Sequence, residues 1–421
     1  MGWWKSILED MEMKTCRFCS LKLNEPVVDL GLSPLANSYL DASQKDQKEF
    51  FYPLKLYFCE NCFLVQLDDV EEPENIFSDY AYLSSYSTTW LNHAREFTNH
   101  VMKRFSLDTT SHVIEIASND GYLLQFFKEN NIPILGIEPA ANIAKIANDK
   151  GIPTLCNFFN ENTADMIIKD GKTADVLIAI NVLPHVPNLH SFVLGMKKLL
   201  KPDGVIIIQF SAYLLPFIQK TMFDSIYHEH YSYFSLITLQ KIFSHHKLEI
   251  FDVEENSIHG GSLRLFIKHA DCSKIKISNN VDKLIKKEID AGIIKISTYT
   301  EFSKKILESK ININNFFIQS LREGKKIVCY GAPAKGNTLL NYCGITQDMI
   351  EYTVDISPHK QGKFLPGTHI PIRNPLEIKK TKPDYLVILA WNLQEEIMSQ
   401  MSFIRKWNAK FVVLIPEVKI F

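Results

Sequence analysis

Four of the eight cysteines form two Cys-x2-Cys pairs, Cys16 with Cys19 and Cys59 with Cys62. Two intervening residues let both sulfurs of a pair face one ion, and two such pairs complete the tetrahedral thiolate set of a zinc site. The gap between the pairs, positions 20–58, exceeds the roughly 15–20 residues usual in a zinc ribbon, so a small subdomain must fill it. Two redox pairs or four unrelated buried cysteines are the alternatives. Because the four cysteines would fill the coordination shell of the ion, we expect the zinc to have a structural role and not a catalytic one.

A second pattern that could do chemistry is the turn SNDG, which follows an apolar strand at Val113–Ala117 and opens a helix. Small side chains let a ligand approach the backbone, and a helix N-terminus offers free N–H groups. Glu115 and Asp120 would face a polar or cationic ligand there rather than a pyrophosphate, and G-x-G-x-x-G is absent from the sequence. Glu138 ends the next strand, where a carboxylate can accept from both hydroxyls of a ribose. This combination suits S-adenosylmethionine (SAM); a plain strand–turn–helix is the alternative.

The third pattern is the segment FDSIYHEHYSYFS, just beyond the expected strand Val205–Phe210. Its spacing is not the HExxH of zinc proteases. On an extended stretch alternate residues share a face, so Tyr227 and Glu229 would point one way and His228 and His230 the other. A histidine that titrates near neutrality is the usual general base, and a nearby carboxylate can orient it. A polar, aromatic surface loop is the alternative.

The elements that must position these residues change character along the chain. Residues 14–70 are rich in Cys, Pro and Gly and contain short extended pieces, Tyr52–Phe58 and Leu64–Leu67, which indicates a β-rich module too short for a core of its own. Helical periodicity follows, above all over Thr88–Phe105. From His112 strands alternate with helices of about 10–15 residues, which predicts a parallel sheet covered on both faces. KPDG is expected to be a turn before Val205–Phe210.

A second α/β unit is expected near the C-terminus. A Lys- and Ile-rich stretch over 274–325 has the periodicity of a connecting helix pair. The strand–helix rhythm then restarts at Lys326–Ala332 and closes at Phe411–Pro416. We therefore predict a zinc-binding module over 14–70, a central Rossmann-like domain over 71–272, and a helical connector with a second Rossmann-like α/β domain over 273–421.

The composition is that of a globular enzyme, with 46% hydrophobic and 22% charged residues, and it excludes disorder, collagen and coiled coil. The net charge of −2 gives no general field for gathering phosphate backbones, and no basic, aromatic-interleaved stripe is visible. We expect no nucleic-acid partner, no membrane partner, and a monomer or homodimer.

Acidic residues near the N-terminus, Glu9, Asp10 and Glu12, stand where a secretory signal would be apolar, so we expect a cytoplasmic protein. The other cysteines (Cys156, Cys272, Cys329, Cys343) are expected in the core.

Taken together, the motifs resemble those of the C-methyltransferases that act on nucleotide-linked keto-deoxysugars. The resemblance covers nearly the whole chain from Lys14 onward. It is carried by CRFC, DLGLSPLANSYL, YPLKLYFCENCFLVQL, YLSSYS, EIASNDGYLL, GIEPAANIA, NVLPHV, YHEHYSYFS, HGGSLR and GAPAKGNTLLNYC. It implies a zinc module, a SAM-dependent methyltransferase domain and a C-terminal α/β domain. It further implies C-methylation next to a ketone, at C-3 of a nucleoside-diphosphate 4-keto-deoxysugar, through an enolate.

The resemblance also implies roles for individual residues. His230 is similar in position to the family's general base, with Glu229 and Tyr227 supporting it. His185 and a tyrosine, Tyr80 or Tyr82, would line the sugar pocket, and His185 or a tyrosine would donate to the enolate oxygen. The residues that the family pattern assigns to SAM binding are Glu115, Ala117, Asn119, Gly121, Glu138, Pro139 and Asn181.

Two further loops are candidates for the nucleotide sugar. GAPAKGNT opens a helix after a strand but lacks the order of a P-loop, so it is not expected to hydrolyse ATP. Lys335, Asn337 and the backbone N–H groups would instead hold the diphosphate, with a tight packing turn as the alternative. His259 and Gly260 would approach the nucleotide or the sugar, since glycine permits close contact.

Rival functions remain open at this point. A sugar O-methyltransferase is the nearest, and an NAD-dependent nucleotide-sugar oxidoreductase or epimerase that uses the C-terminal unit is the next. A zinc-ribbon nucleic-acid binder is the rival from another class, and the near-neutral charge speaks against it.

Overall fold

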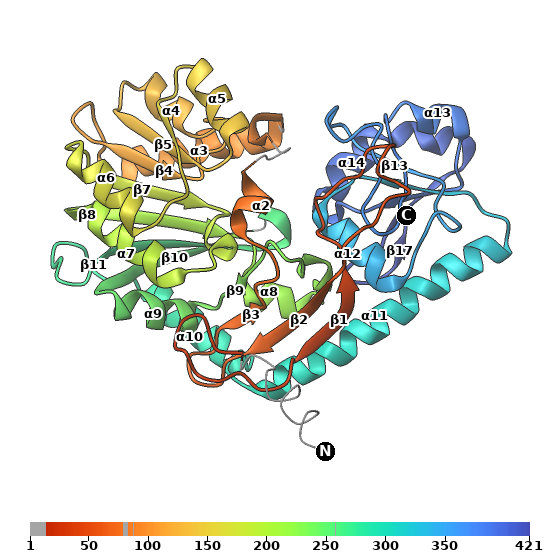
Figure 1. Ribbon diagram of the computed structural model, residues 1–421, viewed down its shortest axis with the longest axis horizontal. Helices are drawn as coiled ribbons and strands as arrows, with labels where there is room; N and C mark the ends of the chain where they lie inside the picture. The colour runs from red at the N-terminus through yellow and green to blue at the C-terminus, as the bar shows by residue number, and fades with distance from the viewer. Residues whose placement is uncertain (1–13, 79–82, 87, 257) are drawn as a thin grey trace.

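The computed structural model describes residues 14–78, 83–86, 88–256 and 258–421 and contains three sheets (Figure 1). The smallest is an antiparallel sheet in the order β1 (Val28–Ser33), β2 (Tyr52–Phe58), β3 (Val65–Leu67) and β9 (Ser232–Tyr233). The first three strands come from the N-terminal module, whereas β9 comes from the central part of the chain. Val65 pairs with Tyr233 and Gln66 with Ser232. The module is therefore joined to the central domain by a shared sheet.

The central sheet carries seven strands in the order β10 (Leu248–Asn256), β11 (Ser262–His269), β8 (Leu200–Phe210), β7 (Ala174–Ile180), β4 (Val113–Ile116), β5 (Ile134–Glu138) and β6 (Thr154–Cys156). Strands β8, β7, β4, β5 and β6 run parallel, and β11 is antiparallel to both of its neighbours. The carboxyl ends of β4, β5 and β7 thus meet at one edge, where open α/β sheets bind ligands. The predicted Rossmann-like domain is confirmed.

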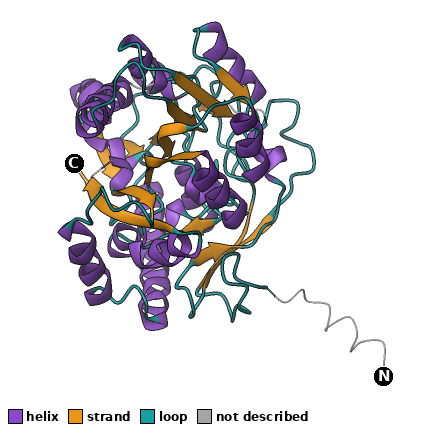
Figure 2. Cartoon of the chain, turned by 90° about the vertical axis from the view of Figure 1, so that its left-hand side faces the viewer, coloured by secondary structure: helices purple, strands orange, loops and turns teal. Residues whose placement is uncertain are grey.

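Helices cover both faces of this sheet because its buried strands are apolar on both sides (Figure 2). Val176 and Ile178 of β7 join the core under one set of helices, while Leu177 and Ala179 join the core under the other. The first set is α3 (Thr88–Phe105), α4 (Leu124–Glu129) and α5 (Ala141–Asp149); the second is α6 (Glu161–Lys169), α7 (Leu189–Leu199) and α9 (Leu236–His245).

The C-terminal sheet has the order β14 (Ile372–Arg373), β13 (Thr353–Val354), β12 (Ile327–Tyr330), β15 (Tyr385–Ile388), β16 (Lys410–Val413) and β17 (Lys419–Ile420). All neighbours are parallel except β17, and the helices are α12 (Ala334–Cys343), α13 (Glu377–Thr381) and α14 (Gln394–Gln400). The predicted helix pair is α10 (Asn279–Asp290) and α11 (Ile296–Arg322), and α11 runs from the central lobe to the C-terminal lobe (Figure 1). The second α/β unit is therefore confirmed.

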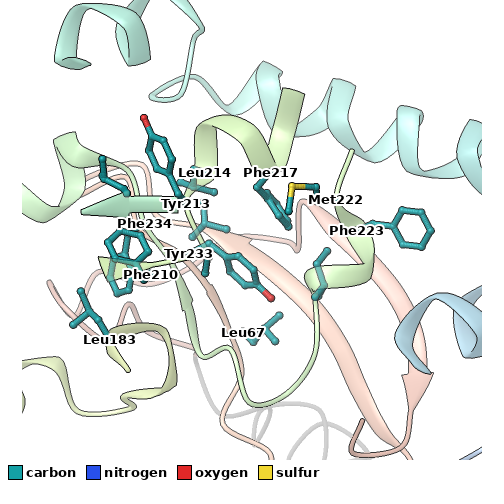
Figure 3. Close-up of a cluster of buried hydrophobic side chains, with 14 of the residues drawn as sticks. Leu67, Leu183, Phe210, Tyr213, Leu214, Phe217, Met222, Phe223, Tyr233 and Phe234 are labelled. Carbon is teal, nitrogen blue, oxygen red and sulfur yellow. The ribbon is translucent and has the colours of Figure 1, made fainter. Parts of the chain in front are cut away.

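The hydrophobic core is continuous between these parts, which explains how a module of short strands is stable. One buried cluster contains residues of the N-terminal sheet, the central domain and the C-terminal domain. Figure 3 shows its central portion, where Leu67 of β3 and Tyr233 of β9 lie with Phe217 of α8 (Leu214–Gln219). Within the described ranges, none of the helices is both long and apolar enough to cross a bilayer.

Two local expectations were wrong. KPDG lies inside β8, where the pairing with β7 shifts register between Ala174 and Val176, so extra residues are absorbed in a bulge rather than a turn. Cys156 is exposed at the end of β6, the outer strand of its sheet, whereas Cys272, Cys329 and Cys343 are buried as expected.

Candidate active site

The four cysteine thiols of the N-terminal module converge on one point. Their sulfurs all lie within 4.8 Å of one another, with 3.4 Å between Cys16 Sγ and Cys62 Sγ and 3.5 Å between Cys19 Sγ and Cys59 Sγ. Four thiolates around zinc at about 2.3 Å would stand roughly 3.8 Å apart, so the arrangement fits the ion. The thiols are buried or half-buried, and two backbone N–H groups, of Phe18 and Cys19, donate to Cys16 Sγ. All four protein ligands are present, as in a structural site.

A large cavity of about 1030 Å³ lies where the three parts of the chain meet. Its wall includes the end of β5 and the turn after β4 on one side, and Pro333, Ala334 and Lys335 at the start of α12 on the other. The N-terminal module adds Asn37 and Tyr39. Ligand sites usually measure about 300–1000 Å³, so this cavity is large enough for two ligands side by side.

The turn after β4 is built from residues with left-handed backbone conformations. Ala117, Asn119 and Gly121 have φ values of +52°, +48° and +78°. Ala117 and Asn119, which the sequence pattern assigns to SAM binding, line the cavity, and Asn119 Oδ1 accepts a hydrogen bond from the Ser84 N–H. Gly121 has a packing role, because a Cβ there would stand 2.8 Å from Ile152 Cγ1. The tight turn brings its backbone to the cavity wall.

Glu138 and Asn181 present the polar groups at this edge of the sheet. The two carboxylate oxygens of Glu138 accept hydrogen bonds from the backbone N–H groups of Asn119 (2.9 Å) and Ala140 (3.0 Å). Burial raises the pKa of Glu138 to about 7, although these two N–H donors oppose the rise. Asn181 Oδ1 also faces the cavity and is buried without a hydrogen-bond partner among the described residues. With Pro139 beside them, these groups fit the ribose and amino-acid tail of SAM.

Glu115 and Asp120, expected to face the ligand, are instead buried inside the domain. Glu115 is 1% exposed, and burial together with Glu138 and Asp120 raises the pKa of Glu115 well above its usual value. Asp120 is fully buried and accepts a hydrogen bond from Lys150 Nζ at 2.8 Å. Glu115 sits in the middle of a strand buried on both faces, so its side chain enters the packed layer instead of the cavity.

The segment from Tyr227 to His230 is a turn, so the predicted alternation of faces was wrong. The His230 N–H donates to the Tyr227 carbonyl at 2.9 Å, which closes the turn. Tyr227, Glu229 and His230 consequently all line the cavity. His228 turns toward the N-terminal module, where its Nε2 lies 3.2 Å from the Pro53 carbonyl oxygen.

His230 is held in a defined orientation. Its Nδ1 donates to the Ser225 carbonyl at 3.0 Å, so Nε2 carries the lone pair and accepts from the Tyr227 hydroxyl at 2.8 Å. Burial lowers the pKa of His230 well below its usual value, and the neighbouring His185 and Lys335 lower it further. The ring is therefore neutral at neutral pH, with an accepting nitrogen beside the cavity.

Two groups flank this histidine. Glu229 Oε1 accepts from Asn37 Nδ2 at 2.6 Å, and burial raises the pKa of Glu229 to about 7. The His185 ring packs edge-on against His230 at 4.9 Å between centroids and donates to the Glu229 backbone carbonyl. Its Nδ1 is buried with no hydrogen-bond partner in the described part of the chain, and burial lowers the pKa of His185 to about 4. His185 thus lines the cavity with an accepting nitrogen.

The C-terminal domain contributes cations to the same cavity, in Lys335, Lys360 and Lys363. Burial lowers the pKa of Lys335, and the carboxylate of Asp224 opposes that shift. Asp224 is itself buried and accepts from Trp391 Nε1 at 2.7 Å. Lys360 Nζ donates to the Ala332 carbonyl at 2.9 Å, and the Tyr39 hydroxyl donates to the same carbonyl at 2.6 Å.

The remaining predicted residues are not all at the cavity. Gly260 packs against Trp391, and Asn337 is buried in α12 with its side-chain atoms unpaired among the residues described, so neither forms the cavity wall as expected. Tyr80, Tyr82 and the side chain of His259 lie outside the described residues.

Sequence reasoning missed the cavity residues Asn37, Tyr39 and Lys360, and it also missed the buried pair of Asp224 and Trp391 behind Lys335. Asn37 and Tyr39 lie in the motif DLGLSPLANSYL, which contributes to the family resemblance but indicates no role for either residue. Nothing in the spacing of these residues indicates that they meet, since hydrogen bonds join Asn37 to Glu229 and Trp391 to Asp224 across domains. Only the three-dimensional fold brings them together.

When the sequence is compared with models of protein families, three models match successive parts of the chain. A zinc binding domain model matches residues 16–77, a methyltransferase domain model matches residues 90–253, and a C-methyltransferase C-terminal domain model matches residues 257–416.

Among curated proteins, the C-methyltransferase NovU of Streptomyces niveus is 32% identical over 405 residues, which are 96% of this chain and 96% of that protein. The sterol 4-C-methyltransferase strm-1 of Caenorhabditis elegans is 27% identical over 26% of this chain and 34% of its own length. Among solved structures, magnesium protoporphyrin IX methyltransferase from Synechocystis PCC 6803 with bound SAM is 13% identical, with a TM-score of 0.34, over 48% of this chain and 99% of that one. At that TM-score the likeness adds nothing to the fold already described.

Proposed function

The chain belongs to the family of SAM-dependent C-methyltransferases with a structural zinc site, and on that basis we propose that it methylates C-3 of a nucleoside-diphosphate 4-keto-deoxysugar. The observation that carries the proposal is the shared cavity. The sheet edge with Glu138 and Asn181, the neutral His230 and the half-buried lysines Lys335, Lys360 and Lys363 all line one space of about 1030 Å³. The methyl donor would bind at the sheet edge, the sugar carbon would lie beside the histidine, and the diphosphate would bind the lysines.

The imidazole of His230 is the proposed base. Its Nδ1–H is fixed on the Ser225 carbonyl, so Nε2 is the atom that receives the proton from the sugar carbon. The depressed pKa keeps this nitrogen unprotonated at neutral pH but makes it a weak base. A carbon next to a ketone is acidic enough for such a base only when the enolate oxygen is stabilised.

Tyr227 is the proposed donor to that oxygen. Its hydroxyl lies 2.8 Å from His230 Nε2, so it can turn from the imidazole to an enolate oxygen formed beside the ring. His185 is less suited to this role, because its N–H is used on the Glu229 carbonyl and its free Nδ1 is an acceptor. We therefore assign His185 to a sugar hydroxyl. SAM, when bound, supplies the methyl group that the carbon nucleophile takes.

The diphosphate is assigned to the C-terminal side of the cavity. Lys335, Lys360 and Lys363 place three cations there, and the N-terminus of the ten-residue helix α12 opens beside them at Pro333 and Ala334. Helix N-termini and lysines are the usual binding partners of phosphate oxygens. This arrangement supports a nucleotide-linked substrate over a free sugar.

Product analysis tests the proposal. The enzyme would be incubated with SAM labelled with carbon-13 on its methyl group and with dTDP-, GDP- and CDP-linked 4-keto-deoxysugars. We expect one sugar product heavier by one labelled methylene, with the label bonded to C-3 in carbon-13 NMR spectra. A label on oxygen would make the protein an O-methyltransferase, and consumption of NAD without methylation would make it an oxidoreductase; either result would refute the proposal.

A further inference from the structure

Three histidines outside the cavity form a second cluster of possible metal ligands. His190 lies in the first turn of α7, and His245 and His246 end α9. One ring nitrogen of each lies within 4.8 Å of the others, and His190 Nδ1 is 3.1 Å from His246 Nε2. We propose that these three imidazoles bind a divalent transition-metal ion of the zinc class, at a site separate from the four cysteines.

The orientation of His190 supports a metal ligand. Its Nε2 donates to the Phe18 carbonyl at 2.7 Å, so the nitrogen facing the other two histidines, Nδ1, carries a lone pair. A backbone carbonyl that holds the far N–H of an imidazole is the usual outer partner of a metal-bound histidine. Phe18 also stacks on the His190 ring, with 5.3 Å between centroids, and fixes its plane.

The spacing of the rings fits one ion. Nitrogens bound to zinc at about 2.0–2.1 Å in a tetrahedron stand roughly 3.3 Å apart, close to the 3.1 Å between His190 and His246. The ring of His245 lies 5.2 Å from that of His190 and 5.0 Å from that of His246, between centroids. A hydrogen bond between two imidazoles accounts for only two of the three rings, whereas an ion accounts for all three.

The charges around the three histidines both favour and oppose the binding of a cation. The rings stand at the C-terminal end of α9, where the helix dipole favours a cation. Lys197 of α7 is a nearby cation and opposes this attraction. His245 is exposed, which leaves the fourth coordination position to water.

An ion here would brace the zinc module against the central domain. Phe18 stands between the ligands Cys16 and Cys19; its N–H donates to Cys16 Sγ and its carbonyl holds His190. A metal bound by His190, His245 and His246 would therefore join α7, α9 and the first cysteine pair. We assign the ion a structural role at this contact.

Titration with zinc alone tests the site. The full-length protein, with its cysteine site loaded, would be titrated with Zn²⁺ in a calorimeter, and crystals soaked in zinc chloride would be examined by anomalous scattering. We expect a second equivalent of zinc and an anomalous peak between His190 Nδ1 and His246 Nε2. His245→Ala removes an exposed ligand, so we expect at least tenfold weaker binding of this second ion with unchanged thermal stability before zinc is added.

His100→Ala is the matched control, since His100 is a half-exposed histidine of α3. It should bind the second equivalent as tightly as the unsubstituted protein. The proposal is overturned if the unsubstituted protein takes up no second equivalent, if the peak lies elsewhere, or if His245→Ala binds zinc as well as the control does.

Discussion

The buried carboxyl of Glu229 stands next in sequence to the proposed base and is held by Asn37 of a different domain. Its pKa of about 7 means that the folded protein keeps it protonated at pH values where the unfolded chain, with a value near 4.5, has lost the proton. The folded state therefore binds more protons in this window, and the contribution of Glu229 to stability declines as the pH rises through it.

Glu229→Gln tests this linkage. Glutamine keeps an acceptor for Asn37 Nδ2 but carries no charge at any pH. We expect the variant to gain about 1–3 kcal/mol in free energy of unfolding relative to the unsubstituted protein between about pH 5 and pH 8. Thermal unfolding of both proteins, compared at each pH, measures this difference in free energy of unfolding. Zinc is released from both proteins when they unfold, so its contribution cancels in the comparison. A difference that stays constant with pH would contradict the raised pKa.

Lys335→Met tests the diphosphate assignment. Loss of a charged donor to phosphate should raise the KM for the nucleotide sugar about tenfold or more, because such hydrogen bonds contribute about 1.5–3 kcal/mol. The affinity for SAM, measured by calorimetry, should not change, and Lys335→Arg should recover part of the loss. Lys325→Met, at a half-exposed lysine paired with Asp384, is the control. An unchanged KM in Lys335→Met would place the diphosphate elsewhere.

Residue types and spacing were sufficient for some of these positions and not for others. Two Cys-x2-Cys pairs identify a metal site because the ligand geometry is local to each pair. Glu138 was predictable from its place at a strand end. The orientation of Glu115 was not, because the sequence does not show whether a side chain within that strand enters the cavity or the packed layer between the sheet and its helices. Tyr227 and His230 share a wall through a turn, whereas an extended segment would have separated His230 from Tyr227.

At the scale of elements, the turn that carries the proposed base is joined to the zinc module by β9. The strand that follows His230 pairs with β3, and the Leu67 N–H donates to the Tyr231 carbonyl at 3.0 Å. The cysteine site at the other end of β2 and β3 thus stabilises the sheet that positions the proposed base. The zinc is distant from the chemistry along the chain but is connected to it by backbone pairing.

Removal of zinc should therefore impair turnover. We expect chelation, or Cys59→Ser, to accelerate hydrogen exchange at the Leu67 amide and at β9, and to reduce kcat more than SAM affinity. The amide of Cys329, bonded to the Tyr352 carbonyl in the C-terminal domain, is the internal control and should keep its protection. Full turnover in zinc-free protein would refute the connection.

Most elements were predictable because their periodicity is strong. Thr88–Phe105 was expected as a helix and is one, and the strands of both α/β units stand at their predicted places. β9 could not be predicted, because it has two residues and forms only through pairing with β3. The bulge at KPDG was missed for a related reason: Pro and Gly indicate a turn locally, while the flanking pairs with β7 hold the strand together.

At the scale of the whole molecule, the cavity exists because three parts of the chain close around it. Trp391 of the C-terminal domain packs on Gly260 of the central domain and donates to Asp224 beside Lys335. A Cβ at Gly260 would stand 2.5 Å from Trp391 Cη2, and the φ of +90° there also disfavours other residues.

Gly260→Ala should consequently move Trp391 and disturb the lysine side of the cavity. We expect a loss of roughly 2 kcal/mol or more in stability, measured by thermal unfolding, and a higher KM for the nucleotide sugar. Gly171→Ala is the matched control, with a φ of +76° but no atom within 4 Å of the added Cβ among the residues described. Gly171→Ala therefore introduces the backbone strain of a positive φ without a clash of the added Cβ. Equal effects of the two substitutions on KM would contradict the packing argument.

The most direct test of the account follows the proton on the sugar carbon. In deuterated solvent without SAM, proton NMR of the 4-keto sugar would measure exchange at C-3 for the unsubstituted protein and for His230→Gln. We predict enzyme-catalysed exchange that His230→Gln slows by about 10²–10⁴, with SAM affinity retained. His228→Gln, at the neighbouring histidine that faces Pro53, should exchange normally. Exchange by His230→Gln at the unsubstituted rate would contradict the assignment of His230 as the base.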